Sequence, residues 1–192
     1  MLVEVGFKLN KPLDYYEELL KANSCENTWN NEIHDTYYTK ENLDGMTENG
    51  MKNACIRLRR NKKMNSNEEE KVGFQNLTLY DKNNFSAPYS DELLNKILDA
   101  GFKQIFDTKK LDIHYKKDGC NGDIQLQPIE NIGLLVYYYN DDYKDMPFEK
   151  QRHKLIDELN SVGFNFSYDE QGLDKLRTLY YETEMFSDNQ NG

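Results

Sequence analysis

The sequence predicts an α+β protein in which many antiparallel strands, with a few helices at their flanks, form a tunnel or barrel. Apolar and polar residues alternate along residues 2–10 and 54–61, which is the period of a half-buried strand. The polar face of these two runs carries Lys8, Arg57 and Arg59. Cations aligned on the inner faces of strands need an anion to neutralise them, so this pattern bears on function as well as on fold.

The first half of the chain reads as short strands joined by polar segments. After the strand at residues 2–10, Pro12 opens a helix whose apolar residues recur at helical spacing. Residues 23–31 and 41–53 are polar or glycine-containing and predict loops. The further strands predicted here cover about residues 33–38, residues 54–61, and a run through Phe74, Leu77 and Leu79.

The second half of the chain has clearer boundaries. Ser90 is a typical N-cap residue and predicts a helix that Gly101 ends, and Pro147 opens a second helix that Gly163 ends. A last helix is predicted at residues 172–182. The strands predicted between these helices cover residues 102–117, 123–129 and 134–139.

Length and composition predict one domain over residues 1–186, followed by a disordered polar tail over residues 187–192. The net charge of −10 argues against a general nucleic-acid or membrane-surface partner, because such partners require a basic surface. Any anion site is therefore expected to be a local basic pocket. We make no prediction of the oligomeric state.

Three cysteines without a CxxC pair predict neither a disulfide framework nor a zinc site. The sequence shows no basic segment followed by an apolar one near its start, and no run of the roughly 20 apolar residues that a membrane span needs. We therefore expect a cytoplasmic protein.

Five short motifs occur in a fixed order along the chain. They are Glu4-x-Gly6-x-Lys8, Asp35-Thr36-Tyr37-Tyr38, Arg57-Leu58-Arg59, Lys110-Leu111-Asp112-Ile113-His114-Tyr115, and Ile132-Gly133 followed by Val136-Tyr137-Tyr138-Tyr139. In this order they resemble the ExExK, second-strand, paired-arginine, KxRxxY and LGxFVEIE motifs of the CYTH superfamily. This family of triphosphate tunnel enzymes includes class IV adenylyl cyclases, thiamine triphosphatases and inorganic triphosphatases.

The resemblance implies an antiparallel tunnel of about eight strands that holds a triphosphate. The phosphate-binding residues that it implies are Lys8, Arg57, Arg59 and Lys110, which would make charge-assisted hydrogen bonds to phosphate oxygens. It also implies Mg²⁺ or Mn²⁺ bound by carboxylates, of which Glu4 is the one retained at a matching position. The residues expected to line the tunnel are Asp112, His114, Gln127, Tyr137 and Tyr139.

The chain departs from the family pattern mainly at its acidic positions. Gly6 replaces the middle glutamate of ExExK, Gln127 replaces an acidic residue, and Tyr137 and Tyr139 replace the glutamates of the EIE strand. Asp112 reverses the charge of a basic position. Two interpretations of the tyrosines stay open: they fill and close the tunnel, or they offer hydroxyl groups and ring faces to an organic ligand.

These residues predict a protein that binds a phosphorylated anion, a triphosphate or a nucleotide, with classical metal-dependent catalysis weak or lost. No catalytic residue is assigned. One alternative is an active Mg²⁺- or Mn²⁺-dependent triphosphatase or class IV adenylyl cyclase-like enzyme with rearranged metal ligands. The other alternative is a non-catalytic scaffold that uses the fold for protein contacts, with Arg57 and Arg59 on a solvated strand face.

Overall fold

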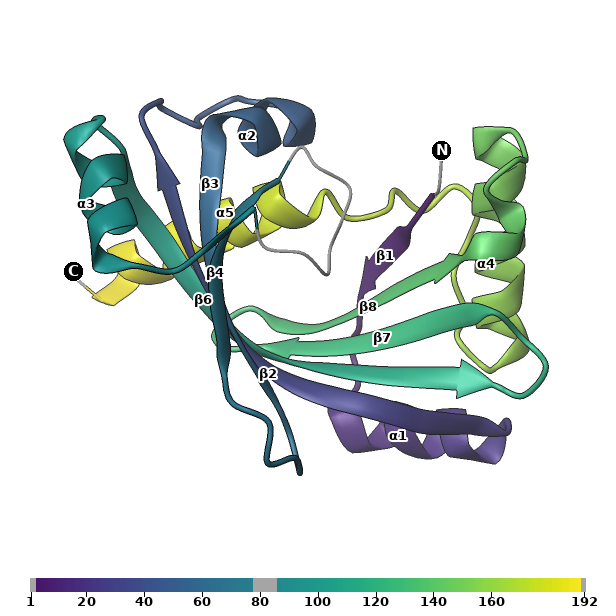
Figure 1. Ribbon diagram of the computed structural model, residues 1–192. Coiled ribbons are helices and arrows are strands. Elements are labelled where there is room, and N and C mark those ends of the chain that lie inside the picture. Colours follow the sequence, from purple (N-terminus) through teal and green to yellow (C-terminus); the bar gives the residue numbers. More distant parts are fainter. Residues whose placement is uncertain (1–2, 78–85, 191–192) are drawn as a thin grey trace. The chain divides into compact units, whose positions relative to one another are not determined.

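The structure is a computed structural model that describes residues 3–77 and 86–190, with side chains as far as Thr183. This part of the chain forms eight strands, five α-helices and one short 3-10 helix at Asp141–Tyr143 (Figure 1). The strands are β1 (Val5–Lys8), β2 (Cys25–Thr39), β3 (Cys55–Lys63), β4 (Lys71–Asn76), β5 (Ala87–Pro88), β6 (Lys103–Lys117), β7 (Gly122–Ile129) and β8 (Gly133–Asn140). The helices are α1 (Leu13–Ala22), α2 (Glu48–Ala54), α3 (Asp91–Asp99), α4 (Phe148–Ser161) and α5 (Lys175–Gln190).

The eight strands form one hydrogen-bonded sheet in the order β1-β8-β7-β6-β2-β3-β4-β5. The pairs β1–β8, β7–β8, β3–β4 and β4–β5 run antiparallel. The predicted α+β class with about eight antiparallel strands is therefore confirmed. The order is that of an open sheet with β1 and β5 as its outer strands, and it contains no pairing that closes a barrel among the described strands.

The chain divides into two compact units. The first unit contains residues 1–31, 111–129 and 133–173, and the second contains residues 32–110, 130–132 and 174–192. Strands β2 and β6 contribute residues to both units. The prediction of one domain over residues 1–186 with a tail over 187–192 stays a prediction; α5 extends to Gln190, and residues 191–192 lie outside the described residues.

Alternation along the strands gives the first unit one apolar and one polar sheet face. Its hydrophobic core contains residues of alternate positions on β1, β6, β7 and β8 together with residues of α1 and α4. Pro12 precedes α1 and Pro147 precedes α4, as predicted, because proline at a helix start loses no intrahelical hydrogen bond. The core residues from the strands are Val5, Phe7, Cys25, Ile113, Tyr115, Ile124, Leu126, Leu134, Val136 and Tyr138, with Cys25 at the start of β2.

The second unit has a smaller core beneath α3. Tyr38, Leu58 and Phe74, from β2, β3 and β4, pack with partly buried residues of α3. Ser90 caps α3 by accepting a hydrogen bond from the Leu93 backbone N–H at 3.1 Å, as its position in the sequence predicted.

A second contact in this unit joins α2 to α5. The Glu48 carboxylate accepts backbone hydrogen bonds from Leu176 at 3.1 Å and from Arg177 at 2.9 Å. These N–H groups belong to the first turn of α5, which has no intrahelical acceptors for them. Glu48 therefore caps α5 from a distant part of the sequence, and its negative charge also suits the positive end of the helix dipole.

Two predicted loops are regular structure. Residues 25–31 are the first half of β2, and residues 48–54 form α2 with Thr47 as its N-cap. The first half of β2 is largely exposed on both faces, so it lacks the apolar alternation by which strands are recognised. The end of the predicted strand through Leu79 lies outside the described residues.

The structure adds one finding on membranes. Within residues 3–77 and 86–190, no helix combines the length and the apolar composition that crossing a membrane requires.

The cap on α5 gives a first prediction. We expect Glu48→Ala to lower the free energy of unfolding by about 1–2 kcal/mol, because two backbone donors lose a charged acceptor. Urea unfolding followed by circular dichroism measures this change. Glu69→Ala, at an exposed position between β3 and β4, is the matched control and should change stability by less than about 0.5 kcal/mol. Equal effects of the two substitutions would contradict the capping role.

Candidate anion-binding site

The second unit gathers three cations around one buried carboxylate. Asp35 lies on β2, Arg57 and Arg59 lie on β3, and Lys110 lies on β6. We call these four residues the Asp35 cluster. Asp35 is fully buried, and the side chains of Arg57, Arg59 and Lys110 are 15%, 12% and 1% exposed.

Arg59 makes the closest contact in this cluster. Its Nε donates to Asp35 Oδ1 and its Nη2 to Asp35 Oδ2, both at 2.7 Å, which is the bidentate geometry that fits a guanidinium to a carboxylate. Lys110 Nζ lies 3.5 Å and Arg57 Nη1 lies 3.7 Å from the same Oδ2. Three positive charges thus approach one negative charge within this unit.

Gln75 fixes the second arginine from the neighbouring strand. Arg57 and Gln75 are directly paired in the β3–β4 register. Arg57 donates to Gln75 Oε1 from Nε at 2.9 Å and from Nη2 at 2.7 Å. A neutral acceptor holds this guanidinium in place without removing positive charge from the cluster.

The cluster controls the ionisation of the groups beside it. Burial alone would raise the pKa of Asp35, but the charges of Arg59, Arg57 and Lys110 hold that pKa well below the ordinary range of a carboxyl group. Burial, and then the charge of Asp35, raise the pKa of Tyr37 to about 12. Asp35 is therefore ionised and Tyr37 neutral at physiological pH.

The sequence identified the cations of this cluster but not its centre. In the sequence Asp35 stands only within the motif Asp35-Thr36-Tyr37-Tyr38, and Gln75 belongs to no motif. One signal for Asp35 was available, because it shares a strand face with Ile33 and Tyr37, and both of these are buried. An acidic residue on a buried face requires a counter-charge, and the arginine strand supplies it.

The remaining predicted site residues belong to the first unit. Glu4 precedes β1 and is partly buried, and Lys8 ends β1 and is exposed. Arg57, Arg59 and Lys110 belong to the second unit. The structure therefore brings together three of the four predicted phosphate-binding residues, and the role of Lys8 stays a prediction.

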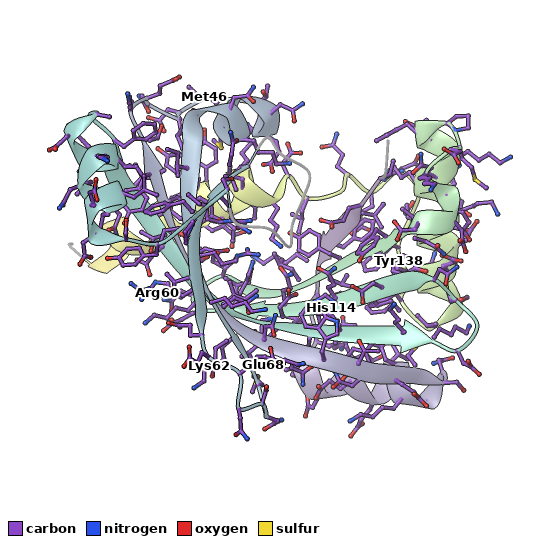
Figure 2. The ribbon with its side chains drawn as sticks, in the orientation of Figure 1. Met46, Arg60, Lys62, Glu68, His114 and Tyr138 are labelled. Carbon is purple, nitrogen blue, oxygen red and sulfur yellow. The ribbon has the colours of Figure 1, made fainter. Side chains whose placement is uncertain are left out.

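A second polar group lies on the polar sheet face of the first unit, where His114 is labelled in Figure 2. His114 Nδ1 lies 2.6 Å from Asp123 Oδ2, and its Nε2 lies 3.2 Å from Asp112 Oδ2. We call these three residues the His114 cluster; all of them are buried. Burial disfavours the charged ring, but the hydrogen bonds and charges of Asp112 and Asp123 outweigh it and raise the pKa of His114.

The predicted tunnel-lining residues surround this cluster. Gln127 Nε2 donates to Asp112 Oδ1 at 2.7 Å, and the Tyr139 hydroxyl lies 3.4 Å from Asp123 Oδ2. Burial, and then the charge of Asp123, raise the pKa of Tyr139 to about 12. Asp123, which the sequence did not predict, joins His114 and Tyr139 by hydrogen bonds, and the ion-pair contact of His114 Nε2 with Asp112 links them to the Asp112–Gln127 pair.

Tyr137 and Gly6 depart from the family pattern together. They are directly paired in the β1–β8 register, and a Cβ atom added to Gly6 would lie 2.3 Å from Tyr137 Cε1. Tyr137 is only 2% exposed, so its ring has little room to move. The tyrosine ring thus fills the space that a side chain at position 6 would need.

The donor set does not fit the metal site that the resemblance implies. Of the matching acidic positions only Glu4 retains a carboxylate, because Gly6, Gln127, Tyr137 and Tyr139 offer none. The nearby Asp112 and Asp123 both contact His114. Among the residues that the structure describes, no group of three or more His, Cys, Asp or Glu side chains could hold a metal ion. We therefore derive no reaction step through a metal ion.

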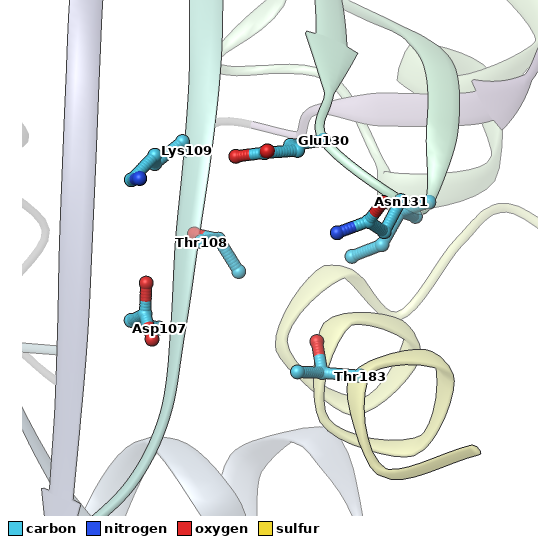
Figure 3. Close-up of a pocket in the computed structure, with 7 residues that line it drawn as sticks. Asp107, Thr108, Lys109, Glu130, Asn131 and Thr183 are labelled. Atoms are coloured by element: carbon cyan, nitrogen blue, oxygen red, sulfur yellow. The ribbon is translucent and has the colours of Figure 1, made fainter. Parts of the chain in front are cut away.

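A pocket of about 190 Å³ in the second unit is separate from these groups (Figure 3). Its charged lining contains two acidic residues, Asp107 and Glu130, and one basic residue, Lys109. This balance disfavours an anion, so the pocket is a weaker candidate than the Asp35 cluster. The full lining is Asp107, Thr108, Lys109, Glu130, Asn131, Ile132 and Thr183.

Fold and site together define an α+β protein with an eight-stranded antiparallel sheet and a buried cation cluster. No protein-family model and no curated protein matches the chain. Solved structures do match it. The PH1012 protein of Pyrococcus horikoshii OT3 is 18% identical with a TM-score of 0.60, and the match covers 94% of this chain and 99% of that one.

Two further structures share the fold. The PH1819 protein of Pyrococcus horikoshii OT3 is 15% identical with a TM-score of 0.63, over 98% of this chain and 99% of that one. A protein of Vibrio parahaemolyticus, called a "putative adenylate cyclase", is 15% identical with a TM-score of 0.52, over 87% of this chain and 94% of that one. At these identities the matches show the fold, which is consistent with the CYTH-like architecture, and not the activity.

The Asp35 cluster gives a prediction on stability. We expect Asp35→Asn to lower the free energy of unfolding by about 3–5 kcal/mol at pH 7, because it leaves partly or fully buried cations without their counter-charge. Since the folded pKa of Asp35 is depressed, its stabilisation is present above the ordinary carboxyl pKa of about 3.9 and is lost as pH falls through the folded pKa. The difference between wild type and variant should therefore shrink below about pH 4.

Denaturant unfolding between pH 3 and pH 7 measures this difference. Glu92→Gln is the control, because Glu92 forms an exposed pair with Lys96 within α3 and should contribute about 0.5 kcal/mol or less. A pH-independent difference for Asp35→Asn would show that the loss comes from packing and not from charge.

The close approach of Gly6 and Tyr137 gives a further prediction. We expect Gly6→Ala to destabilise the protein by about 1–3 kcal/mol through overpacking, and to have a smaller effect in a Tyr137→Ala background. Thermal unfolding of the two single variants and the double variant measures the coupling. Gly172→Ala is the control, because its added Cβ would meet no atom closer than 3.6 Å. Simple additivity of the two changes would contradict the proposed steric origin.

Proposed function

We propose that this protein binds a phosphorylated anion, a triphosphate or a nucleotide, at the Asp35 cluster. The observation that carries the proposal is the convergence of Arg57, Arg59 and Lys110, from two strands, on a single carboxylate. A guanidinium group has five N–H donors, so it can hold a protein acceptor on one edge and a phosphate oxygen on another. The lysine adds a compact charge that suits a polyphosphate.

Rigidity of the donors supports the same function. Asp35 and Gln75 hold the two guanidinium groups with bonds of 2.7–2.9 Å before any ligand arrives. A preformed site loses less conformational entropy on binding than one built from mobile surface lysines. The strong negative charge of the whole chain, −10, makes such a local site selective, because phosphate is repelled from the acidic surface elsewhere.

The CYTH-like fold supports a triphosphate or nucleotide as the ligand class, and the similarity to the Vibrio parahaemolyticus protein extends this line by analogy. Catalysis is not part of the proposal. Most carboxylates that would hold Mg²⁺ or Mn²⁺ are replaced, with Glu4 as the one retained, and the buried Asp35, Asp112 and Asp123 are engaged by the protein's own donors.

Ligand-dependent melting tests the proposal. Millimolar tripolyphosphate or ATP should raise the melting temperature, since a ligand at about 100 times its Kd adds about 2.7 kcal/mol to the free energy of unfolding. The shift should fall as salt is added, because phosphate contacts of this kind are screened. Arg57→Gln should abolish most of the shift.

Arg60→Gln is the matched control for this experiment. Arg60 follows Arg59 on β3, is exposed, and lies 5.9 Å from the Tyr89 ring instead of in the Asp35 cluster (Figure 2). This variant should keep the full shift. A wild type that shows no shift with either ligand would favour the scaffold alternative, and release of phosphate or a cyclic nucleotide with Mg²⁺ or Mn²⁺ would favour the enzyme alternative.

A further inference from the structure

Both ring nitrogens of His114 face carboxylate oxygens. Nδ1 is hydrogen-bonded to Asp123 Oδ2 at 2.6 Å, and Nε2 makes a looser contact with Asp112 Oδ2 at 3.2 Å. A neutral imidazole has one donor and one acceptor nitrogen, so one lone pair would point at a negatively charged oxygen. Only the imidazolium, with a proton on each nitrogen, makes both contacts attractive.

The other described residues that contact His114 are neutral. The Trp29 ring from β2 stacks on His114 with the ring centroids 3.3 Å apart, and Asn27 and Thr28 donate hydrogen bonds to the His114 backbone oxygen. From β7 and β8 come the Gln125 amide and the Tyr139 hydroxyl, which both contact Asp123 Oδ2. The charged groups in contact with the ring are therefore Asp112 on its own strand and Asp123 on β7.

The same two carboxylates are poorly suited to a metal ion. Gln127 occupies Asp112 Oδ1, His114 faces Asp112 Oδ2, and three donors converge on Asp123 Oδ2. Asp123 Oδ1 is buried and has no hydrogen-bond partner among the described residues, but one oxygen atom is not a coordination sphere. The imidazolium already supplies positive charge between the two strands.

We propose that His114 is a buried cation, protonated at physiological pH, that lies between Asp112 and Asp123, offsets their negative charge and joins β6 to β7, so that these carboxylates do not serve a divalent metal ion. Two carboxylates with one imidazolium leave a single negative charge, which is far less costly to bury than two. The inference concerns the first unit alone and is independent of anion binding.

Nuclear magnetic resonance of the ¹⁵N-labelled protein reads the protonation state directly. His34→Gln and His153→Gln assign the signals of the three histidines. An ordinary histidine titrates near pH 6.5, so at pH 8 a neutral ring is the default. We expect both nitrogens of His114 to carry protons at pH 8, and a neutral tautomer there would overturn the proposal.

Removing the charge of one of the two carboxylates provides a second test of the proposal. Asp123→Asn keeps the size of the side chain and should lower the pKa of His114, whereas Asp142→Asn, at an exposed carboxylate of the same unit, should leave it unchanged. An unchanged His114 pKa in Asp123→Asn would refute the carboxylate clamp. If that variant does not fold, the measurement on the wild type still decides.

Added Mn²⁺ tests the exclusion of metal. We expect no preferential broadening of the His114 signals at submillimolar Mn²⁺, and selective broadening with loss of the imidazolium signal would overturn the proposal. The dependence of stability on pH tests the protonation of His114 separately. Because the folded pKa is raised, the stabilisation is complete below about pH 6.5 and is lost as pH rises through the folded pKa. The melting temperature of the wild type should thus fall at alkaline pH more than that of His114→Gln.

Discussion

A charged side chain can be buried only beside a counter-charge, and this constraint organises both units of the chain. Strand alternation sends one set of residues into an apolar core and the other set to a polar face. Several of the polar residues are nevertheless buried, among them Asp35, Asp112, His114 and Asp123. Asp35 and Asp123 have their counter-charges on neighbouring strands, so the strand order decides which partner is available, whereas Asp112 contacts His114 on its own strand.

The sequence predicted the class of fold and most elements because their signals are local. Pro12, Ser90 and Pro147 mark helix starts through their own backbone chemistry, and apolar alternation marks the buried strands. The sequence did not predict the first half of β2 or the whole of α2, because both elements are stabilised by contacts with distant residues. Glu48 of α2, for example, is explained by its bonds to α5, which begins more than a hundred residues later.

The sequence indicates the basic residues of the candidate site but not the acidic residues that pair with them. Arg57, Arg59 and Lys110 stand out because several cations on one strand face are unusual. The partner of His114 on β7, Asp123, has no such signal, since the pairing depends on which strand lies beside β6. The sequence also does not show that two substitutions depend on each other. The absence of a side chain at Gly6 is explained only by the strand register, which places Tyr137 opposite it.

A metal-assisted phosphate site needs two things at once, cations that can face phosphate and carboxylates that can face a metal ion. Here the carboxylates are the groups that the protein satisfies internally: Arg59 holds Asp35 at two points, and His114 lies between Asp112 and Asp123. Gln75, which holds Arg57, is uncharged, and Asp35 is shared by three cations. The acidic half of such a site is thus replaced or engaged in this protein while Arg57, Arg59 and Lys110 remain, and this difference is the reason that we propose anion binding without a metal ion.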